Sequence, residues 1–241
     1  MTDPSPSKEP RQRWRIVIAR GEAARELLHR DVTTAWETGL LASGLPLAMT
    51  EGATRRPRVT FAAPAPLGMI AERELLDIVL SRILRIDQVR GAVERSAPGG
   101  YRLVDLYDVW LGRPSLAASV VAGDYRVSID PEGAADRDPL RLGEVEAAVA
   151  ALLAATRVER TRVKGQGAVT VDIRPHLSTL RVGMAAGGDD LELRMRLRLG
   201  GEGGVGRPEE VVAALGERLG GRLVARRIVR ERIVLADDED R

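Results

Sequence analysis

Alternating apolar and polar residues predict a strand near the beginning of the chain. Within residues 13–19, Trp14, Ile16 and Ile18 share one face, and two arginines and a valine occupy the other. A period of two residues is typical of an extended strand with one buried face. We therefore expect a half-buried strand here, ended by Gly21.

The period then changes to that of a helix. Leu28, Val32, Trp36 and Leu40 recur every fourth residue and give residues 28–43 a single apolar stripe. A glycine directly after this segment is a favourable helix end, and a proline two residues later prevents the helix from resuming.

Further segments complete a β-α-β-β-α-β order in the first half of the chain. This order is the split-βαβ, or ferredoxin-like, arrangement of an antiparallel sheet with two helices on one face. The segments are a short extended lead-in at residues 45–49, strands at 58–62 and 74–80, a helix at 86–95 and a strand at 101–111.

The same order is predicted again after a linker at residues 112–115. Five apolar residues at positions 191–199 alternate strictly with charged ones, which makes this the clearest strand of the chain. The other predicted elements are strands at 124–130, 157–173 and 222–235, helices at 142–155 and 208–219, a polar loop at 131–139 and a glycine bend or bulge at 165–167.

These patterns predict an α+β protein made of two tandem ferredoxin-like domains. The first covers residues 13–114 and the second residues 115–236, with a disordered tail at 1–12 and an acidic tail at 237–241. A chain of 241 residues is long enough for two small domains or one large one. A single larger α+β domain is therefore the alternative.

Composition limits the chemistry of the chain. It contains no cysteine, which excludes disulfides, thiolate metal sites, Fe–S ligation and cysteine nucleophiles from this polypeptide. No apolar run approaches the ~20 residues that span a bilayer. Residues 1–12 also lack the apolar core of a signal peptide. We expect a cytoplasmic protein without a membrane segment.

The basic residues are almost all arginine. Of 37 basic residues only Lys8 and Lys164 are lysines, which leaves 35 arginines, while the net charge is only +2. A GC-rich coding bias explains such a preference. Recognition of phosphate or carboxylate groups explains it as well, because the guanidinium fork suits them better than an ammonium group.

Several motifs of the first half carry a family resemblance. They are Leu28-His29-Arg30-Asp31, Gly44-Leu45-Pro46-Leu47-Ala48, Thr50-Glu51-Gly52, Ala65-Pro66-Leu67-Gly68 and Glu74-Leu75-Leu76-Asp77. In order and spacing, over roughly residues 13–115, they resemble the radical-SAM-linked or radical-SAM-associated family DUF2344. Two positions depart from the family pattern. Leu28 replaces a serine that would cap the helix, and Ala53-Thr54-Arg55 replaces Phe-Asn-Pro.

The resemblance implies a partner rather than a reaction. Members of the family occur fused to, or encoded beside, a cobalamin-type radical-SAM protein, and they carry no cluster-binding cysteines themselves. The resemblance therefore implies that a partner carries the Fe–S cluster, SAM and cobalamin, and that this chain carries no cofactor.

The start of the first predicted helix holds the catalytic candidates. His29 and Asp31 lie in the first turn, where free N–H groups and the helix dipole favour an anion. With Glu51 they have the residue types for acid–base chemistry or for a three-ligand divalent metal site. In the structural alternative, Asp31 complements the dipole and His29 caps or packs. No nucleophile accompanies them.

Two groups of arginines are candidates for binding a nucleic acid or another anion. Arg55, Arg56 and Arg58 follow Glu51 in one loop, where a phosphate is expected to bind with His29 as a further donor. On the predicted strand at 191–199, Arg194, Arg196 and Arg198 share one face, and the last strand adds Arg227.

The arginine faces suggest an RNA platform of a particular kind. A ferredoxin-like sheet with a basic open face is a common RNA-binding surface. The stacking aromatics of such platforms are missing from the arginine strand, since aromatic residues make up 3% of the chain. Contacts are therefore expected to involve backbone phosphates. A solvated or interdomain face is the structural alternative. The glycine-rich run at 200–207 lacks the ending of a phosphate-binding Walker loop and reads as a connector.

The sequence thus predicts an accessory protein that binds RNA, or an RNA-modifying radical-SAM partner, without catalysing a reaction on its own. An RNA-processing or metal-assisted enzyme centred on His29, Asp31 and Glu51 is the alternative from a different class. A purely structural adaptor is the third.

Overall fold

The computed structural model describes residues 9–130, 139–165, 167–185, 190–200 and 204–238. The chain forms two compact units, one of Met1–Val120 with Leu235–Arg241 and one of Val121–Val234. The sequence-based boundary at residue 114 lies within the first unit. Most of the predicted loop at 131–139, part of each predicted tail, and Gln166 of the predicted glycine bend lie outside the described residues. Among the described helices, none is long and apolar enough to cross a membrane.

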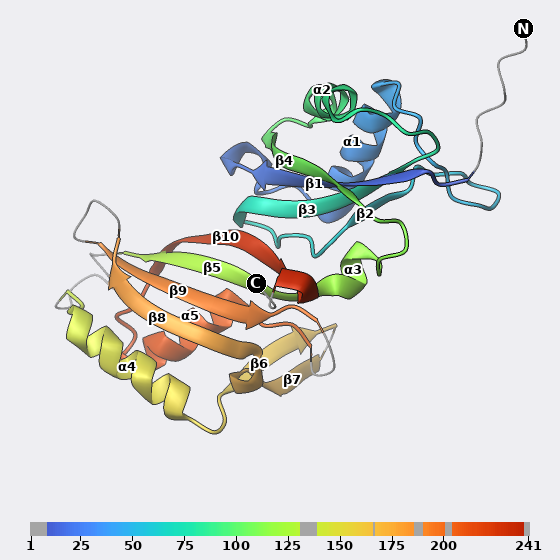
Figure 1. The fold of residues 1–241 in the computed structure, drawn as a ribbon. Helices are drawn as coiled ribbons and strands as arrows, with labels where there is room; N and C mark the ends of the chain where they lie inside the picture. Colours follow the sequence, from blue (N-terminus) through green and yellow to red (C-terminus); the bar gives the residue numbers. More distant parts are fainter. Residues whose placement is uncertain (1–8, 131–138, 166, 186–189, 201–203, 239–241) are drawn as a thin grey trace, which may run out of the picture. The chain divides into compact units, whose positions relative to one another are not determined.

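Unit 1 contains a four-stranded antiparallel sheet with two helices on one face (Figure 1). The spatial order of the strands is β4-β1-β3-β2. The elements are β1 (Gln12–Arg20), α1 (His29–Ala42), β2 (Val59–Phe61), β3 (Ile70–Leu80), α2 (Ile86–Ser96) and β4 (Tyr101–Val109), followed by the short helix α3 (Leu116–Ser119). The predicted β-α-β-β-α-β order is therefore present in this unit.

The core of unit 1 lies between the sheet and its helices. Trp14, Ile16 and Ile18 of β1 pack in one cluster with the α1 stripe and with apolar residues of β3 and α2. In that stripe Val32, Trp36 and Leu40 are buried, as predicted. Leu28 is instead 41% exposed and precedes the helix, with no side-chain cap.

The expectation that β1 is half-buried is wrong, because every residue of the strand is buried. On the face away from the helices, Arg15 lies opposite Asp77 of β3 in the strand register. Its Nε and Nη2 donate to the two carboxylate oxygens at 2.8 and 3.0 Å, and both side chains are only 4% exposed. Arg13 approaches the same carboxylate at 3.4 Å. A charged side chain can thus be buried in a strand when it is paired, although the alternation pattern predicts that it faces solvent.

Hydrogen bonds and the charge of Asp77 hold the pKa of Arg15 above its usual value, although burial acts in the opposite direction. Arg13 also donates to the main-chain oxygens of Arg113 and Pro114 at 3.2 and 3.3 Å. The cluster therefore connects β1, β3 and the chain at Arg113–Pro114 by side-chain hydrogen bonds and ion pairs.

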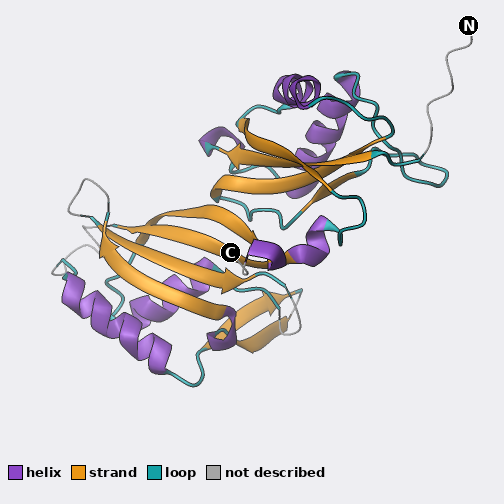
Figure 2. Ribbon diagram, in the orientation of Figure 1, coloured by secondary structure: helices purple, strands orange, loops and turns teal. Residues whose placement is uncertain are grey.

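Unit 2 repeats the arrangement, with a sheet order of β10-β5-β9-β8 and both long helices on one face (Figure 2). Its elements are β5 (Val120–Ile129), α4 (Leu142–Ala154), β6 (Glu159–Lys164), β7 (Gly167–Asp172), β8 (Leu177–Met184), β9 (Leu191–Arg198), α5 (Pro208–Arg218) and β10 (Ala225–Leu235). The strict alternation predicted for β9 is confirmed, since Leu193, Met195 and Leu197 are all buried. Both units contain helices beside antiparallel strands, so the prediction of an α+β protein is confirmed.

The predicted strand at 157–173 is wrong in two respects. The segment is a hairpin, β6 and β7, which forms a separate two-stranded sheet. Gly165 adopts φ +61° at its turn. The sheet strand that sequence reasoning missed is β8. Its register against β9 shifts between Leu177 and Thr179, and this shift breaks the period of two by which strands are recognised.

Replacing Asp77 with asparagine is expected to destabilise the chain. It leaves two buried guanidinium groups without their carboxylate, which costs about 3–5 kcal/mol. Urea unfolding measures the loss. Asp87→Asn is the matched control, because Asp87 also pairs with an arginine, Arg85, but both side chains are mostly exposed. The control is expected to leave the unfolding midpoint unchanged. Equal effects of the two variants would contradict the assignment.

Candidate functional site

A hollow of about 660 Å³ lies beside the loop that follows α1. It is lined by Pro10, residues 47–52, Arg55, Arg58 and Ser81. Three of the residues singled out from the sequence, Glu51, Arg55 and Arg58, therefore line one space.

Main-chain hydrogen bonds hold the floor of this hollow. The N–H of Ala48 donates to Val79 at the end of β3, and the carbonyl of Ala48 accepts from Arg58, at 2.7 and 2.8 Å. The segment around Ala48 is thus held from both sides. Ser81 donates its N–H and its hydroxyl to the carbonyl oxygen of Pro46, at 2.8 and 3.1 Å.

The rim of the hollow is a closed loop. The N–H of Thr50 donates to the carbonyl oxygen of Arg56 at 2.8 Å, and the N–H of Arg56 donates back to the Thr50 hydroxyl at 3.0 Å. Gly52 adopts φ +116° within the loop, a conformation that side-chain-bearing residues rarely adopt. The Thr50-Glu51-Gly52 motif therefore has a geometric role in shaping the rim.

The three arginines of this loop differ in their partners. Arg56 donates from Nε and Nη2 to one carboxylate oxygen of Glu37, at 3.2 and 2.8 Å. Arg55 and Arg58 are exposed and form no ion pair within the described part of the chain. Two guanidinium groups consequently remain available at the hollow, whereas Arg56 fastens the loop to α1.

His29 occupies a different and much smaller space. It is the first residue of α1, and its ring meets Phe61 edge-on at a centroid distance of 5.4 Å. The hollow that it lines with Arg20, Glu74 and Tyr101 measures about 20 Å³, which is room for about one water molecule. Burial, and then the charge of Arg20, lower the pKa of His29.

Arg20 joins the segments around the small hollow that His29 lines. Its guanidinium donates to five carbonyl oxygens at 2.8–3.3 Å. Two belong to Ala65 and Pro66 in the Pro-Leu-Gly turn, and the other three lie just before α1. The motifs in this region therefore serve to join a turn to the beginning of a helix.

The catalytic candidates are not brought together. Glu51 and His29 line separate hollows, and Asp31 lines neither while it pairs with the adjacent Arg30 at 3.3 Å. No group of three histidine or acidic residues in the described segments could hold a metal ion. The three-ligand arrangement considered for His29, Asp31 and Glu51 is not formed.

Two of the three arginines of β9, Arg194 and Arg196, lie in a network with acidic residues. Arg196 donates from Nε and Nη2 to Asp124 of β5 at 2.7 and 3.0 Å, and Arg232 of β10 pairs with the same carboxylate at 2.8 Å. Arg194 pairs with Glu192 at 2.9 Å. Charge pairs of this kind leave little net potential for a polyanion.

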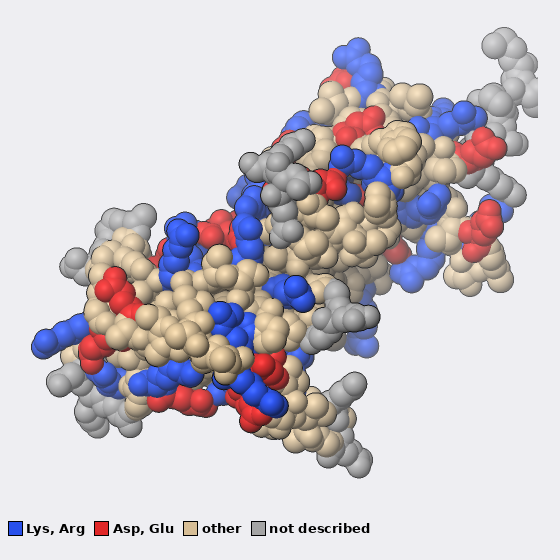
Figure 3. Space-filling view, turned by 60° about the horizontal axis from the view of Figure 1, so that its bottom comes forward, with Lys and Arg blue, Asp and Glu red and all other residues tan. Residues whose placement is uncertain are grey.

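Two other candidate arginines of unit 2 remain exposed, Arg198 on β9 and Arg227 on β10. On the face that Figure 3 draws, basic and acidic side chains are interspersed rather than gathered into one basic area. Arg194 also approaches Glu231 of β10 at 4.0 Å. Asp124 lies 72 residues from Arg196 in the sequence, so only the strand pairing reveals this partner.

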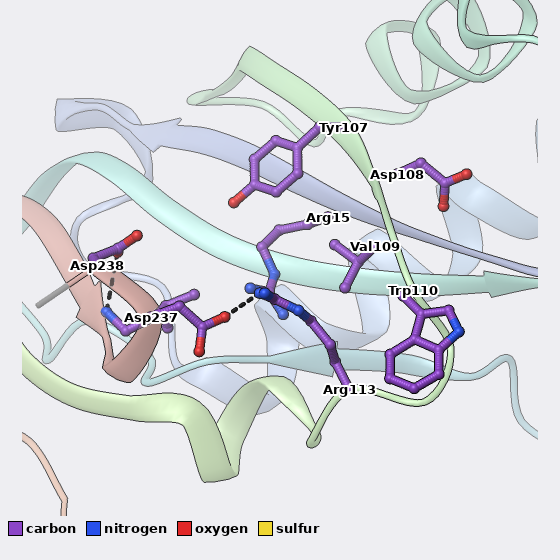
Figure 4. Close-up of a pocket in the computed structure, with 9 residues that line it drawn as sticks. Arg15, Tyr107, Asp108, Val109, Trp110, Arg113, Asp237 and Asp238 are labelled. Atoms are coloured by element: carbon purple, nitrogen blue, oxygen red, sulfur yellow. Dashed lines mark hydrogen bonds and ion pairs between the residues drawn. The ribbon is translucent and has the colours of Figure 1, made fainter. Parts of the chain in front are cut away.

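Sequence reasoning missed a second hollow in unit 1. It measures about 440 Å³, and its lining includes Arg15, Tyr107, Trp110, Arg113 and Asp237 (Figure 4). The sequence contains one indication of this hollow. Tyr107 and Trp110 are three positions apart near the end of a predicted strand, so strict alternation does not place both in the core.

The comparisons with known proteins identify a family. The family described as "Uncharacterized protein conserved in bacteria (DUF2344)" matches residues 13–208. The chain belongs to this family, as its motifs led us to expect. The match extends well into unit 2. No curated protein matches the chain.

Two solved structures resemble the chain at low similarity. One, described as "Crystal Structure of a Cbf5-Nop10-Gar1 Complex", has 10% identity and a TM-score of 0.44 over 90% of this chain and 49% of that one. The other, "Structure of Thermus Thermophilus Cse3 bound to an RNA representing a pre-cleavage complex", has 14% identity and a TM-score of 0.22 over 89% of this chain and 99% of that one. The chain spans about half the length of the first. Both scores are too low to carry an argument about function.

The second histidine predicts a pH dependence of stability. His176 is 3% exposed, and its Nδ1 is buried without a hydrogen-bond partner. Burial, and then the charges of Arg162 and Arg198, lower its pKa from the usual 6.5. The unfolded chain therefore binds the proton more readily. Stability is fully present above about pH 6.5 and falls as the pH drops through that value.

Urea unfolding at pH 7.5, 6.5 and 5.5 measures this dependence. In the His176→Gln variant, the free energy of unfolding is expected to decrease less between pH 7.5 and pH 5.5 than in the wild type. His29→Gln, at an exposed position, is expected to retain most of this decrease. A wild-type stability that is constant or increases as the pH falls over this range would contradict the prediction.

Proposed function

We propose that this DUF2344 protein is an accessory protein that binds RNA. The phosphates of the RNA backbone bind at the hollow beside the Thr50–Arg58 loop. The observation that carries the proposal is the pair Arg55 and Arg58, which are exposed at the same hollow without an ion-pair partner in the described chain. Two guanidinium groups without an ion-pair partner, beside a loop closed by two hydrogen bonds, suit a phosphate ligand.

Two further features support binding rather than catalysis. Glu51 is the one titratable carboxyl or histidine in the lining of this hollow, and it has no general acid–base partner there. His29 lines a different, small hollow, and neither Asp31 nor Glu51 lines it. The alternative of an enzyme centred on His29, Asp31 and Glu51 has no corresponding support.

We infer that both units are ferredoxin-like. Each has the strand order fourth-first-third-second, with β6 and β7 as an added hairpin in unit 2. This arrangement of sheet and helices is a frequent scaffold for RNA recognition. We place the RNA contact on unit 1, because Arg126, Arg194, Arg196 and Arg232 of the unit 2 sheet pair with Asp124, Glu192 and Glu231, whereas Arg55 and Arg58 lie together at one hollow.

The family resemblance leads us to propose a radical-SAM enzyme as the partner, in the cytoplasm. Such an enzyme binds its Fe–S cluster through cysteine thiolates. This chain has no cysteine, so the cluster would belong to the partner, to which the family resemblance also assigns SAM and cobalamin.

The paired variant Arg55→Gln/Arg58→Gln is expected to weaken RNA binding. The wild-type chain should bind single-stranded RNA with an affinity that falls steeply with salt, because phosphate contacts release counterions. Removal of two contacts should reduce the slope of log K against log salt by about 1.4. Filter binding with fluorescent RNA over a salt series measures it.

Arg194→Gln/Arg196→Gln is the matched control, since it removes the same charge from arginines that are already paired. It should leave the slope unchanged. A wild-type chain that does not bind RNA at low salt, or a loss caused only by the control pair, would contradict the proposal.

A further inference from the structure

The two exposed aromatic side chains of the protein lie at one hollow. Its seven aromatic residues all fall in described segments, and the other five are buried or partly buried. Trp110 is 75% exposed and Tyr107 is 42% exposed, and both line the hollow of about 440 Å³ in unit 1 (Figure 4). Large exposed aromatic side chains are uncommon, and their convergence on one space indicates a binding surface.

The Trp110 ring has a defined position at the rim. A Cβ placed on Gly112 would lie 2.5 Å from the indole, so the ring lies directly over a residue that has no side chain. Figure 4 shows Trp110 and Tyr107 at two ends of the hollow, with the guanidinium groups of Arg15 and Arg113 between them. Arg113 pairs with Asp237, and Arg15 is held by Asp77.

The charges around this hollow select against phosphate. Asp108, Asp237 and Asp238 contribute to its lining, and both guanidinium groups already have carboxylate partners. Carboxylates accept hydrogen bonds from the amino groups of nucleobases and repel phosphate. The flat indole supplies a stacking face at the same place.

The strand register places this hollow near the arginine-lined one. Val109, which lines the aromatic hollow, lies opposite Arg13, and Arg13 lies opposite Val79. The N–H of Ala48, in the floor of the arginine-lined hollow, donates to Val79. Three strand spacings separate the two sites, about 14 Å across one end of the unit 1 sheet. A few nucleotides of an extended single strand span this distance.

We infer that the hollow at Trp110 and Tyr107 is a nucleobase-stacking subsite for single-stranded RNA whose phosphates bind at Arg55 and Arg58. The inference rests on the proposed RNA binding and adds that the RNA is single-stranded, with an unpaired base at this hollow. A base stacks on the Trp110 indole, and its amino group donates to a carboxylate of the lining. The subsite therefore prefers adenine, cytosine or guanine to uracil, and it does not accept paired bases.

Intrinsic fluorescence tests the subsite directly. Trp14 and Trp36 are 4% and 0% exposed, so Trp110 is the one tryptophan that a ligand can stack upon. Addition of oligoadenylate to the wild-type chain should quench tryptophan emission. Trp110→Ala should weaken oligoadenylate binding about tenfold, as measured by anisotropy. Trp110→Phe should retain most of the affinity and lose the quenching.

Two further variants separate stacking from nonspecific effects. Gly112→Ala retains the indole but displaces it, so its affinity should fall between those of the wild type and Trp110→Ala. Ile83→Ala removes an equally exposed apolar side chain, also 75% exposed, from the loop after β3. It should leave binding unchanged. Oligouridylate and duplex RNA should bind the wild-type chain more weakly than oligoadenylate.

The outcomes distinguish this inference from the proposed function. If Arg55→Gln/Arg58→Gln weakens binding while Trp110→Ala does not, the stacking subsite is wrong and the phosphate site stands. Equal affinities for oligoadenylate and duplex RNA would also overturn the subsite. If the wild-type chain does not bind RNA at low salt, both the subsite and the proposed function are wrong.

Discussion

The buried cluster of Arg13, Arg15 and Asp77 is the constraint on which the arrangement of unit 1 depends. Arg15 and Asp77 face each other across β1 and β3, and a shift of one residue would turn one of them into the helix-facing core. Such a shift would leave a buried charge unpaired at a cost of several kcal/mol. The pair therefore specifies the register of the central strands.

That register positions everything proposed to be functional. It aligns Val109, Arg13 and Val79 in one row, which continues through a hydrogen bond to Ala48. The ends of this row lie at the aromatic hollow and at the arginine-lined hollow. Arg13 also holds the chain that follows β4 through the carbonyl oxygens of Arg113 and Pro114. One buried charge cluster thus links the sheet to both candidate binding surfaces.

Much of the fold follows from periodicity, but charge pairing across strands does not. The α1 stripe and the β9 alternation identify their elements, because burial on one face leaves a clear period. Alternation predicts a solvent-facing Arg15, because its partner Asp77 is 62 residues away in sequence and leaves no local signal. The same limitation applies to Arg196, because its partner Asp124 is 72 residues away in sequence. The β8 strand was missed because a register shift interrupts its alternation.

The candidate site was recognised in part from the sequence. The loop of Glu51, Arg55 and Arg58 was identified because closely spaced arginines follow a glycine turn. The separation of His29 from that loop depends on Arg20 and Phe61, which no local pattern reveals. The sequence pattern alone does not distinguish an exposed Trp110 from a core aromatic residue of the same predicted strand.

Chemical-shift mapping tests the central claim most directly. In an ¹⁵N-labelled chain titrated with oligoadenylate, the account predicts that amides of the Thr50–Arg58 loop and the indole N–H of Trp110 shift together, at the same RNA concentration. The amides of β9 should remain unchanged. Shifts confined to β9 and β10, with the Trp110 indole unaffected, would contradict the account.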